Sequence, residues 1–227
     1  MKPPTVGSAT PAIPVAGPAT SRLLIRSLDV ALASLALIAT APVLAIVALL
    51  VRLSSPGPIL FRQLRVGYLE QPFTMLKFRT MYAGCEDRVH RDFVTRMLTA
   101  GPTGGAEADG RFKLAADPRV TGIGRFLRRS SLDELPQLWN VLRGEMSLVG
   151  PRPALPWEVA LYEPQHRLRF QVRPGMTGLW QVRGRNRVSM RTALDLDVEY
   201  ATRQRIGLYL WILLLTLPAV LRGDGAR

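Results

Sequence analysis

The sequence of 227 residues is poor in the side chains that form covalent cross-links or bind zinc. Its single cysteine, Cys85, excludes an internal disulfide, and two histidines, His90 and His166, supply too few ligands for a Cys/His zinc site. Aromatic residues make up only 7% of the chain, which leaves few rings to stack on nucleic-acid bases. A metal, if the protein uses one, is therefore expected on oxygen ligands.

Lysine is also scarce, although the chain is strongly basic. Only 3 of the 30 basic residues are lysine, and the 17 acidic residues leave a formal net charge of +13. Because the planar guanidinium of arginine binds phosphate through two parallel hydrogen bonds, this bias favours a phosphorylated partner: nucleic acid, anionic lipid or nucleotide. For an individual arginine, the alternative is a basic face that only holds the protein at an anionic membrane surface.

The longest apolar run follows a polar leader. Residues 1–20 are rich in Pro, Ala, Thr and Ser and predict a disordered segment. From Val30 to Val51 there are 22 residues without a charge, about the length that spans a bilayer core. Pro42 lies within this run, removes one helical hydrogen bond and predicts a kink. A fully buried core helix is the alternative interpretation.

Arginines flank this run on both sides, namely Arg22, Arg26, Arg52, Arg62 and Arg65. A helix that spans a membrane usually has an excess of Lys and Arg at its cytoplasmic end, and here the asymmetry is weak. A helix that enters the membrane, bends at Pro42 and leaves on the same side satisfies both flanks. We therefore predict that residues 21–55 form a re-entrant membrane helix, with a spanning helix as the alternative.

A second apolar stretch runs from Ile206 to Leu221. Its 16 residues, with Pro218 among them, are few for a membrane span. Tyr209 and Trp211 near its start favour a helix that lies in the membrane interface or packs in the core. The same apolar surface is suited to lipid or to a second copy of the chain, so membrane lipids and a homodimer are both expected partners.

Residues 56–227 are predicted to form a basic catalytic domain of mixed structure. Aromatic and β-branched residues of Ile59–Met81 surround a turn at Val66–Pro72, which predicts a β-hairpin. Gly101–Gly110 reads GPTGGAEADG and lacks the Gly-Lys-Ser/Thr ending of a phosphate-binding loop, so we interpret it as a flexible connection. The expected fold class is α/β, mostly helical with one small hairpin.

The stretch Ser130–Leu142, SSLDELPQLWNVL, contains the acidic residues with the clearest chemical potential. Ser131 and Glu134 have the spacing of a capping box, and apolar residues then recur at helical spacing. A second interpretation makes Asp133 the cap, because Pro136 fits best in a first helical turn. Both place Asp133 and Glu134 at the N-terminus of a helix.

A helix N-terminus stabilises negative charge, both that of a carboxylate and that of a bound phosphate. Arg125, Arg128 and Arg129 lie just upstream and add positive potential. An aspartate that stays ionised beside phosphate-binding arginines is a suitable nucleophile toward phosphorus. The alternative is structural: Asp133 and Glu134 only cap the helix and pair with these arginines.

Three ordered blocks of the sequence resemble one known family. The blocks are Phe61–Met81, FRQLRVGYLEQPFTMLKFRTM; Asp117–Pro153, DPRVTGIGRFLRRSSLDELPQLWNVLRGEMSLVGPRP; and Arg167–Asn186, RLRFQVRPGMTGLWQVRGRN. Together with the apolar run before them, they resemble the bacterial sugar transferases, which are monotopic polyprenyl-phosphate phosphoglycosyl transferases. The resemblance covers nearly everything from Ser21 to the C-terminus.

The resemblance implies a membrane-bound enzyme at the inner membrane whose catalytic domain faces the cytoplasm. Members move a sugar 1-phosphate from a UDP-sugar to undecaprenyl phosphate and release UMP, which starts the synthesis of an exopolysaccharide or lipopolysaccharide glycan. The Asp-Glu pair of the family matches Asp133 and Glu134. Asp133 would attack the phosphorus bonded to the sugar and form a covalent intermediate, and the pair would hold Mg²⁺.

The matching blocks also supply candidate phosphate-binding residues, which are Lys77, Arg79, Arg128, Arg152 and Arg185. Arg152 is the strongest of them, because Pro151 and Pro153 restrict the chain on both sides and limit the entropy lost on fixing its side chain. The resemblance also matches Asp197 to an acidic position, for which an ion pair is the simpler role.

The sequence departs from the family's pattern at a few positions. Ala41 replaces the serine before Pro42, and Glu70 stands where a turn glycine is common. Near the C-terminus, Gln204, Arg205 and Tyr209 replace a Trp-Ser pair and an aspartate. We expect these changes to affect membrane docking or substrate choice.

Two other functions agree with parts of the sequence. One is an inactive scaffold of the same pathway, and the other is a membrane-tethered nucleic-acid binder suggested by the net charge of +13. The chain has no recognisable helix-turn-helix or RNA-binding motif, so nucleic acid is not an expected partner. The identity of the sugar cannot be predicted from these residues.

Overall fold

The computed structural model describes residues 18–82, 84, 95, 117–183 and 188–221. The first helix, α1, runs from Ala19 to Ser54, so the expected leader ends two residues earlier than predicted. Residues 1–17, the stretch Gly101–Gly110 and Arg185 lie outside the described residues. The predictions for them therefore stay predictions.

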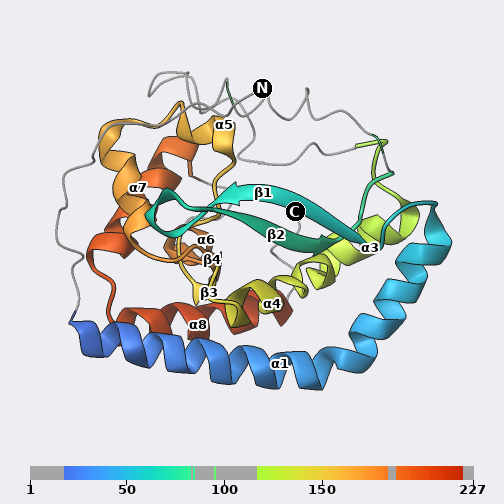
Figure 1. Ribbon diagram of the computed structural model, residues 1–227, viewed down its shortest axis with the longest axis horizontal. Coiled ribbons are helices and arrows are strands. Elements are labelled where there is room, and N and C mark those ends of the chain that lie inside the picture. The colour runs from blue at the N-terminus through green and yellow to red at the C-terminus, as the bar shows by residue number, and fades with distance from the viewer. Residues whose placement is uncertain (1–17, 83, 85–94, 96–116, 184–187, 222–227) are drawn as a thin grey trace.

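Helix α1 lies along one side of the molecule and changes direction part of the way along (Figure 1). Pro42 lies inside this helix. The hydroxyl of Thr40 donates to the carbonyl oxygen of Ala36 at 2.6 Å. A hydroxyl is thus present near the proline although Ala41 lacks one, and it binds a backbone carbonyl one turn earlier.

The predicted hairpin is confirmed. Strands β1 (Leu60–Val66) and β2 (Pro72–Phe78) pair in antiparallel register, with Phe61 opposite Lys77 and Val66 opposite Pro72. A short 3₁₀ turn, η1 (Tyr68–Glu70), connects them.

A second two-stranded sheet was not predicted. In it β3 (Ser147–Val149) lies parallel to β4 (Gly175–Thr177), and α5 (Pro156–Val159) and η3 (Pro164–Gln171) lie between them in the sequence. Glycines allow the close approach, because a Cβ on Gly175 would lie 2.0 Å from the backbone nitrogen of Gly150. Three-residue strands are too short to give a period-2 pattern, so the sequence offered no signal.

Five more helical elements surround these sheets: α3 (Gly122–Ser130), α4 (Gln137–Leu142), α6 (Leu179–Arg183), α7 (Met190–Thr202) and α8 (Ile206–Leu221). The described part of the chain is therefore mostly helical with a small β content, as expected. Figure 1 shows α3 and the start of α8 at opposite ends of the long axis of the molecule.

The predicted start of a helix at Ser131 or Asp133 is wrong. Ser131 has φ 57° and ends α3, and its side chain makes no capping hydrogen bond. The 3₁₀ turn η2 (Leu132–Glu134) follows, and α4 begins only after Pro136. The end of the preceding helix fixes Ser131 in the left-handed conformation, which excludes the extended backbone that a capping residue needs.

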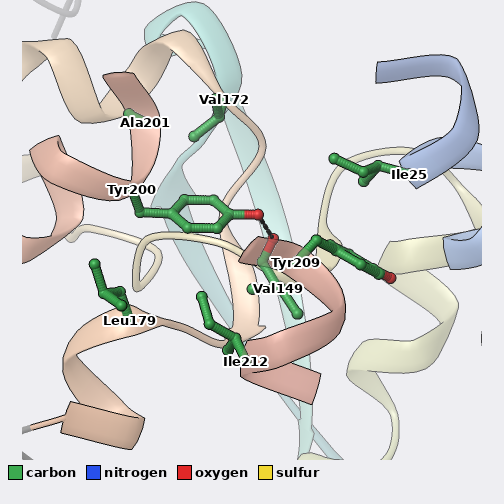
Figure 2. Close-up of a cluster of buried hydrophobic side chains, with 8 residues drawn as sticks. All are labelled: Ile25, Val149, Val172, Leu179, Tyr200, Ala201, Tyr209 and Ile212. Atoms are coloured by element: carbon green, nitrogen blue, oxygen red, sulfur yellow. Dashed lines mark hydrogen bonds between the residues drawn. The ribbon is translucent and has the colours of Figure 1, made fainter. Parts of the chain in front are cut away.

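Helix α1 shares its buried face with the rest of the chain. Ile25 packs with Val149, Tyr200 and Ile212 in the cluster shown in Figure 2. Further along the helix, Ala33 joins a second cluster and Val47 a third. The N-terminal helix and the domain that follows it are therefore parts of one core.

Two tyrosines in the first cluster bind polar groups. The hydroxyl of Tyr200 donates to the carbonyl oxygen of Val149 at 3.1 Å (Figure 2). The hydroxyl of Tyr209 points away from the cluster and donates to Asp29 of α1 at 2.8 Å. Asp29 is 1% exposed and also accepts from the hydroxyl of Ser147 and the backbone nitrogen of Leu148. The network ties α1 to β3 and α8.

Much of α1 and α8 is apolar and exposed. Within the described ranges, α1 is the only helix long and apolar enough to cross a membrane. Ile38 is 74% exposed, and Leu35, Ile46 and Leu53 are exposed on the same helix. Helix α8 buries Tyr209 and Ile212 and exposes Leu210, Trp211, Leu214 and Leu215. Both helices therefore pack one face on the core and leave another apolar face free.

Candidate active site

Asp133 and Glu134 lie together in η2, between α3 and α4. Asp133 is 8% exposed, so the residue is buried. The ammonium group of Lys77, near the end of β2, donates to Oε1 of Glu134 at 2.7 Å. The hairpin therefore brings one of the predicted cations directly to the predicted acidic pair.

Arg128 supplies the second cation near this pair. Its Nε donates to the hydroxyl of Thr80 at 2.9 Å, which fixes α3 against the chain just after β2. Burial lowers the pKa of Arg128, whereas the charges of Asp133 and Asp117 raise it. Because arginine is too strongly basic to lose its proton in a protein, the guanidinium stays charged close to Asp133. We call Lys77, Arg128, Asp133 and Glu134 the dyad site.

The dyad site has an acidic neighbour that sequence reasoning did not single out. Asp117 accepts from the guanidinium of Arg119, with 2.7 Å between Arg119 Nη2 and Asp117 Oδ2. Hydrogen bonds from Arg119 hold the pKa of Asp117 below its usual value. The Asp-Pro-Arg sequence at 117–119 was part of a matching block, and the two-residue spacing of opposite charges was the available signal.

The number of carboxylates in the dyad site fits a magnesium ion. Among the described residues, no group of three or more His, Cys, Asp or Glu side chains is placed to hold a metal ion. Mg²⁺ is commonly held by only one or two carboxylates, with water and substrate phosphates completing the octahedron. Asp133 and Glu134 are two such carboxylates, so they fit a metal whose other ligands come from a phosphorylated substrate.

Among the described residues, the hydrogen-bond partners of Arg79 are backbone carbonyls, and none of them belongs to the dyad site. Arg79 is 5% exposed, and its guanidinium donates to the carbonyl oxygens of Val51, Ser55 and Pro56 at 3.2, 2.6 and 2.9 Å. These carbonyls belong to the last turn of α1 and the residues after it. Arg79 therefore donates hydrogen bonds to backbone carbonyls at the C-terminal end of α1, where helical partners are lacking.

Arg152 is also not brought to the dyad site. Its neighbour Ala154 forms a bridge with Val66, at the opposite end of β1 from Phe61, the partner of Lys77. Five residues along a strand correspond to about 17 Å. Arg152 instead lies 3.7 Å from Glu158, measured from Nη1 to Oε1.

Arg152 lies at the edge of a set of charged and polar side chains around the buried Arg169. We call this set the buried charge cluster: Arg152, Glu158, Tyr162, Arg169 and Asp197. Arg169 donates to Asp197 at 2.6 Å, to the hydroxyl of Tyr162 at 2.8 Å and to the carbonyl oxygen of Arg152 at 2.6 Å. Arg169 and Asp197 are each 3% exposed at the side chain. The ion pair expected at Asp197 is therefore present.

Burial shifts the pKa values of two members of the buried charge cluster. Burial raises the pKa of Asp197 to about 6, and Arg169 opposes that rise, so the carboxylate is ionised at neutral pH. Burial likewise raises the pKa of Tyr162 to about 12. Glu158 and Arg169 were not predicted from the sequence. A Glu and an Arg among other charged residues give no sign that they will be buried.

Two departures from the family's pattern have local structural partners. Glu70 has φ 59°, a conformation that favours glycine, and its carboxylate accepts from Nη1 of Arg167 at 2.9 and 3.0 Å. Tyr209, in place of an aspartate, donates to Asp29. Both substitutions therefore add contacts between elements of this chain.

The chain belongs to the bacterial sugar transferase family, whose family model matches residues 20–223. It is 44% identical over 201 residues to the exopolysaccharide production protein ExoY of Sinorhizobium fredii, a match that covers 88% of this chain and 87% of that protein. The chain is thus a transferase of known family, as the sequence blocks predicted.

Two further relatives have names that state a reaction. The UDP-glucose:undecaprenyl-phosphate glucose-1-phosphate transferase of Caulobacter vibrioides is 42% identical over 209 residues, covering 88% of this chain and 71% of that protein. The undecaprenyl-phosphate galactose phosphotransferase of Salmonella typhimurium is 39% identical over 207 residues, covering 91% of this chain but 42% of that protein. This chain therefore spans less than half the length of the Salmonella relative.

Proposed function

We propose that the protein transfers a sugar 1-phosphate from a UDP-sugar to undecaprenyl phosphate and releases UMP, in the step that starts an exopolysaccharide or lipopolysaccharide glycan. The observation that carries the proposal is the dyad site: a nearly buried Asp133 beside Glu134, with Lys77 and Arg128 adjacent, in a chain of this family. The names of the Caulobacter and Salmonella relatives support the two substrates.

The reaction is proposed in two steps at one phosphorus atom. An oxygen of Asp133 forms a bond to the phosphorus that carries the sugar, and the bond from that phosphorus to the oxygen of UMP breaks, so UMP leaves with the electron pair. An oxygen of undecaprenyl phosphate then attacks the same phosphorus and displaces Asp133, which regains its carboxylate. The lipid product is a sugar diphosphate.

The neighbours of Asp133 have defined tasks in this scheme. Arg128, held by Thr80, offsets the charge of the diphosphate, and its positive charge favours the ionised form of Asp133. Lys77 holds Glu134 in place from the adjoining strand. Mg²⁺, when bound by Asp133 and Glu134, would neutralise further phosphate charge. Arg152 and Arg185 are proposed to contact more distant parts of the substrates.

We further propose that α1 is re-entrant and that the domain faces the cytoplasm at the inner membrane. Both ends of α1 are tied to the same domain, since Arg26 donates to the carbonyl oxygens of Val141 and Leu142, and Arg79 to that of Ser55. Only the exposed apolar residues between these ends are then available to lipid. A helix that crossed the bilayer would carry one end away from the domain.

The test is the release of nucleotide from a panel of UDP-sugars by detergent-solubilised protein with undecaprenyl phosphate and Mg²⁺. We expect UMP from one sugar, and none from Asp133→Asn. Asp195→Asn is the matched control, since its side chain is 61% exposed on α7. Release of UDP would instead mean ordinary glycosyl transfer, and no nucleotide from any sugar would favour the inactive scaffold.

A further inference from the structure

An open groove lies at the start of α8, away from the dyad site. It encloses about 430 Å³ and is lined by Arg183, Arg205, Gly207, Leu208 and Trp211. Arg183 ends α6, and the other four residues belong to α8 or directly precede it. This end of α8 and helix α3, which η2 follows, lie at opposite ends of the long axis in Figure 1. The groove is therefore separate from the dyad site, although Arg185, a proposed substrate contact, follows Arg183 by two residues.

The groove is positively charged. Arg183 lies over the ring of Trp211, with 5.7 Å from its guanidinium carbon to the ring centroid. Glu199 is shared between Arg183 at 3.4 Å and Arg203 at 3.1 Å, so one carboxylate serves two cations. Within the described part of the chain, the side chain of Arg205 makes no ion pair or hydrogen bond. Its donors are free to bind an anion in the groove.

An apolar surface continues from the groove along α8. Leu210, Leu214 and Leu215 are exposed there, and Trp211, 40% exposed, stands at the boundary. A tryptophan between charged and apolar surfaces is typical of the membrane interface, because its ring is apolar and its N–H is polar. The sequence of features, two arginines, then tryptophan, then leucines, matches a molecule with an anionic head and an apolar tail.

We propose that this groove binds the headgroup phosphate of an anionic phospholipid, such as phosphatidylglycerol, with its acyl chains along the exposed leucines of α8. Arg205 and Arg183 bind the phosphate, and the open space beside Gly207, where a Cβ would meet no atom within 4 Å, admits the glycerol. The proposal rests on the membrane location given under the proposed function, and it is independent of the transfer chemistry.

The experiment is native mass spectrometry of the full chain in detergent, titrated with dioctanoyl phosphatidylglycerol or dioctanoyl phosphatidylcholine. Arg205→Gln and Arg183→Gln are compared with Arg203→Gln, which removes the same charge two residues from Arg205 but does not line the groove. We expect wild type and Arg203→Gln to retain one phosphatidylglycerol in preference to phosphatidylcholine. Each groove variant should bind it about fivefold more weakly.

Three results would overturn the proposal. If Arg203→Gln weakened binding as much as the groove variants do, the lipid would respond to the general charge of the surface. If low millimolar inorganic phosphate displaced the lipid, the groove would be a simple anion site. If farnesyl phosphate bound more strongly, the groove would belong to the acceptor lipid. Gly207→Glu is a second test in case Arg183→Gln fails to fold, since it adds an opposing charge where space is open. Asp133→Asn should lose the transferase activity but still bind phosphatidylglycerol. A failure of the lipid proposal can therefore be distinguished from a failure of the proposed function.

Discussion

Lys77 and Glu134 form the contact that joins the hairpin to the acidic turn. Both residues were predicted for the site from the family resemblance, Lys77 as a phosphate contact and Glu134 as a metal ligand, but the contact between them was not predicted. Arg79 was predicted for the same site, yet its partners are backbone carbonyls at the end of α1. Every residue has a backbone carbonyl, so the sequence does not show which carbonyl will accept a hydrogen bond from a side chain. This kind of partner therefore cannot be predicted from side-chain chemistry.

Removal of the Lys77 ammonium group should impair activity more than stability. In Lys77→Met, Glu134 loses its 2.7 Å contact with the ammonium group. Misplacement of a catalytic group by about 1 Å can cost about a hundredfold in rate. We expect kcat/KM for UMP release to fall by about tenfold to a hundredfold. Arg143→Met, which removes the partner of Glu145 in a 3.4 Å surface pair, is the control and should change the rate by less than about twofold.

The ion pair of Arg169 and Asp197 should respond asymmetrically to substitution. Asp197→Asn leaves a buried guanidinium without its counter-charge, which costs about 3–5 kcal/mol in the free energy of unfolding. The double variant Arg169→Met/Asp197→Leu removes both charges and should recover at least half of that loss. Denaturant unfolding in detergent measures both values, and equal losses in the single and double variants would contradict the expectation.

At the scale of elements, apolar composition predicted α1, α8 and the hairpin, because their patterns extend over seven residues or more. The turn η2 was predicted as part of a longer helix. The reason for the error is tertiary: α3 ends at Ser131 in a left-handed conformation, and the chain must turn before α4 can begin. Capping patterns are read from local sequence and cannot report where a preceding helix stops.

The position of α3 depends on Gly124. A Cβ at this residue would lie 2.1 Å from the carbonyl oxygen of Thr80, so Gly124→Ala must move the helix away from the chain that follows β2. Because Arg128 binds Thr80 from the same helix, we expect a loss of about 1–3 kcal/mol in the free energy of unfolding together with a lower rate of UMP release.

Gly122, two residues earlier in α3, provides the matched control. A Cβ there would meet no atom within 4 Å, so Gly122→Ala should be tolerated or stabilise the fold by about 0.4–1 kcal/mol. Thermal unfolding of the two alanine variants side by side checks the prediction. Similar stability for both would mean that the close approach at Thr80 is unimportant.

At the scale of the whole molecule, α1 is both the apolar helix and a component of three core clusters. Composition predicted the first role and could not predict the second, since an apolar residue fits lipid and protein core equally well. The buried residues Ile25, Ala33, Val47 and Val51 recur along one face of the helix. This face binds the domain and leaves the remainder for lipid.

The geometry of α1 predicts which side of the membrane its ends reach. In a Cys85→Ser background, single cysteines at the exposed positions Thr20 and Ser54 should both react with a membrane-impermeant thiol reagent from the cytoplasmic side only. Pro42→Leu restores the missing backbone donor and favours a straight helix, so part of the population should lose cytoplasmic labelling at one of the two positions. Labelling from opposite sides in the unsubstituted helix would exclude the re-entrant form.

The bond between Tyr209 and Asp29 also sets an order of events during biosynthesis. The two residues are separated by 180 positions. At about 5–20 residues per second, the ribosome needs roughly 10–35 s to make Tyr209 after Asp29 has been added. During that interval the carboxylate of Asp29 lacks this partner, and a charged group is costly in hydrocarbon. Until Tyr209 is made, we expect the part of α1 around Asp29 to stay in water, and the contact with Tyr209 of α8 then completes the attachment of α1 to the domain.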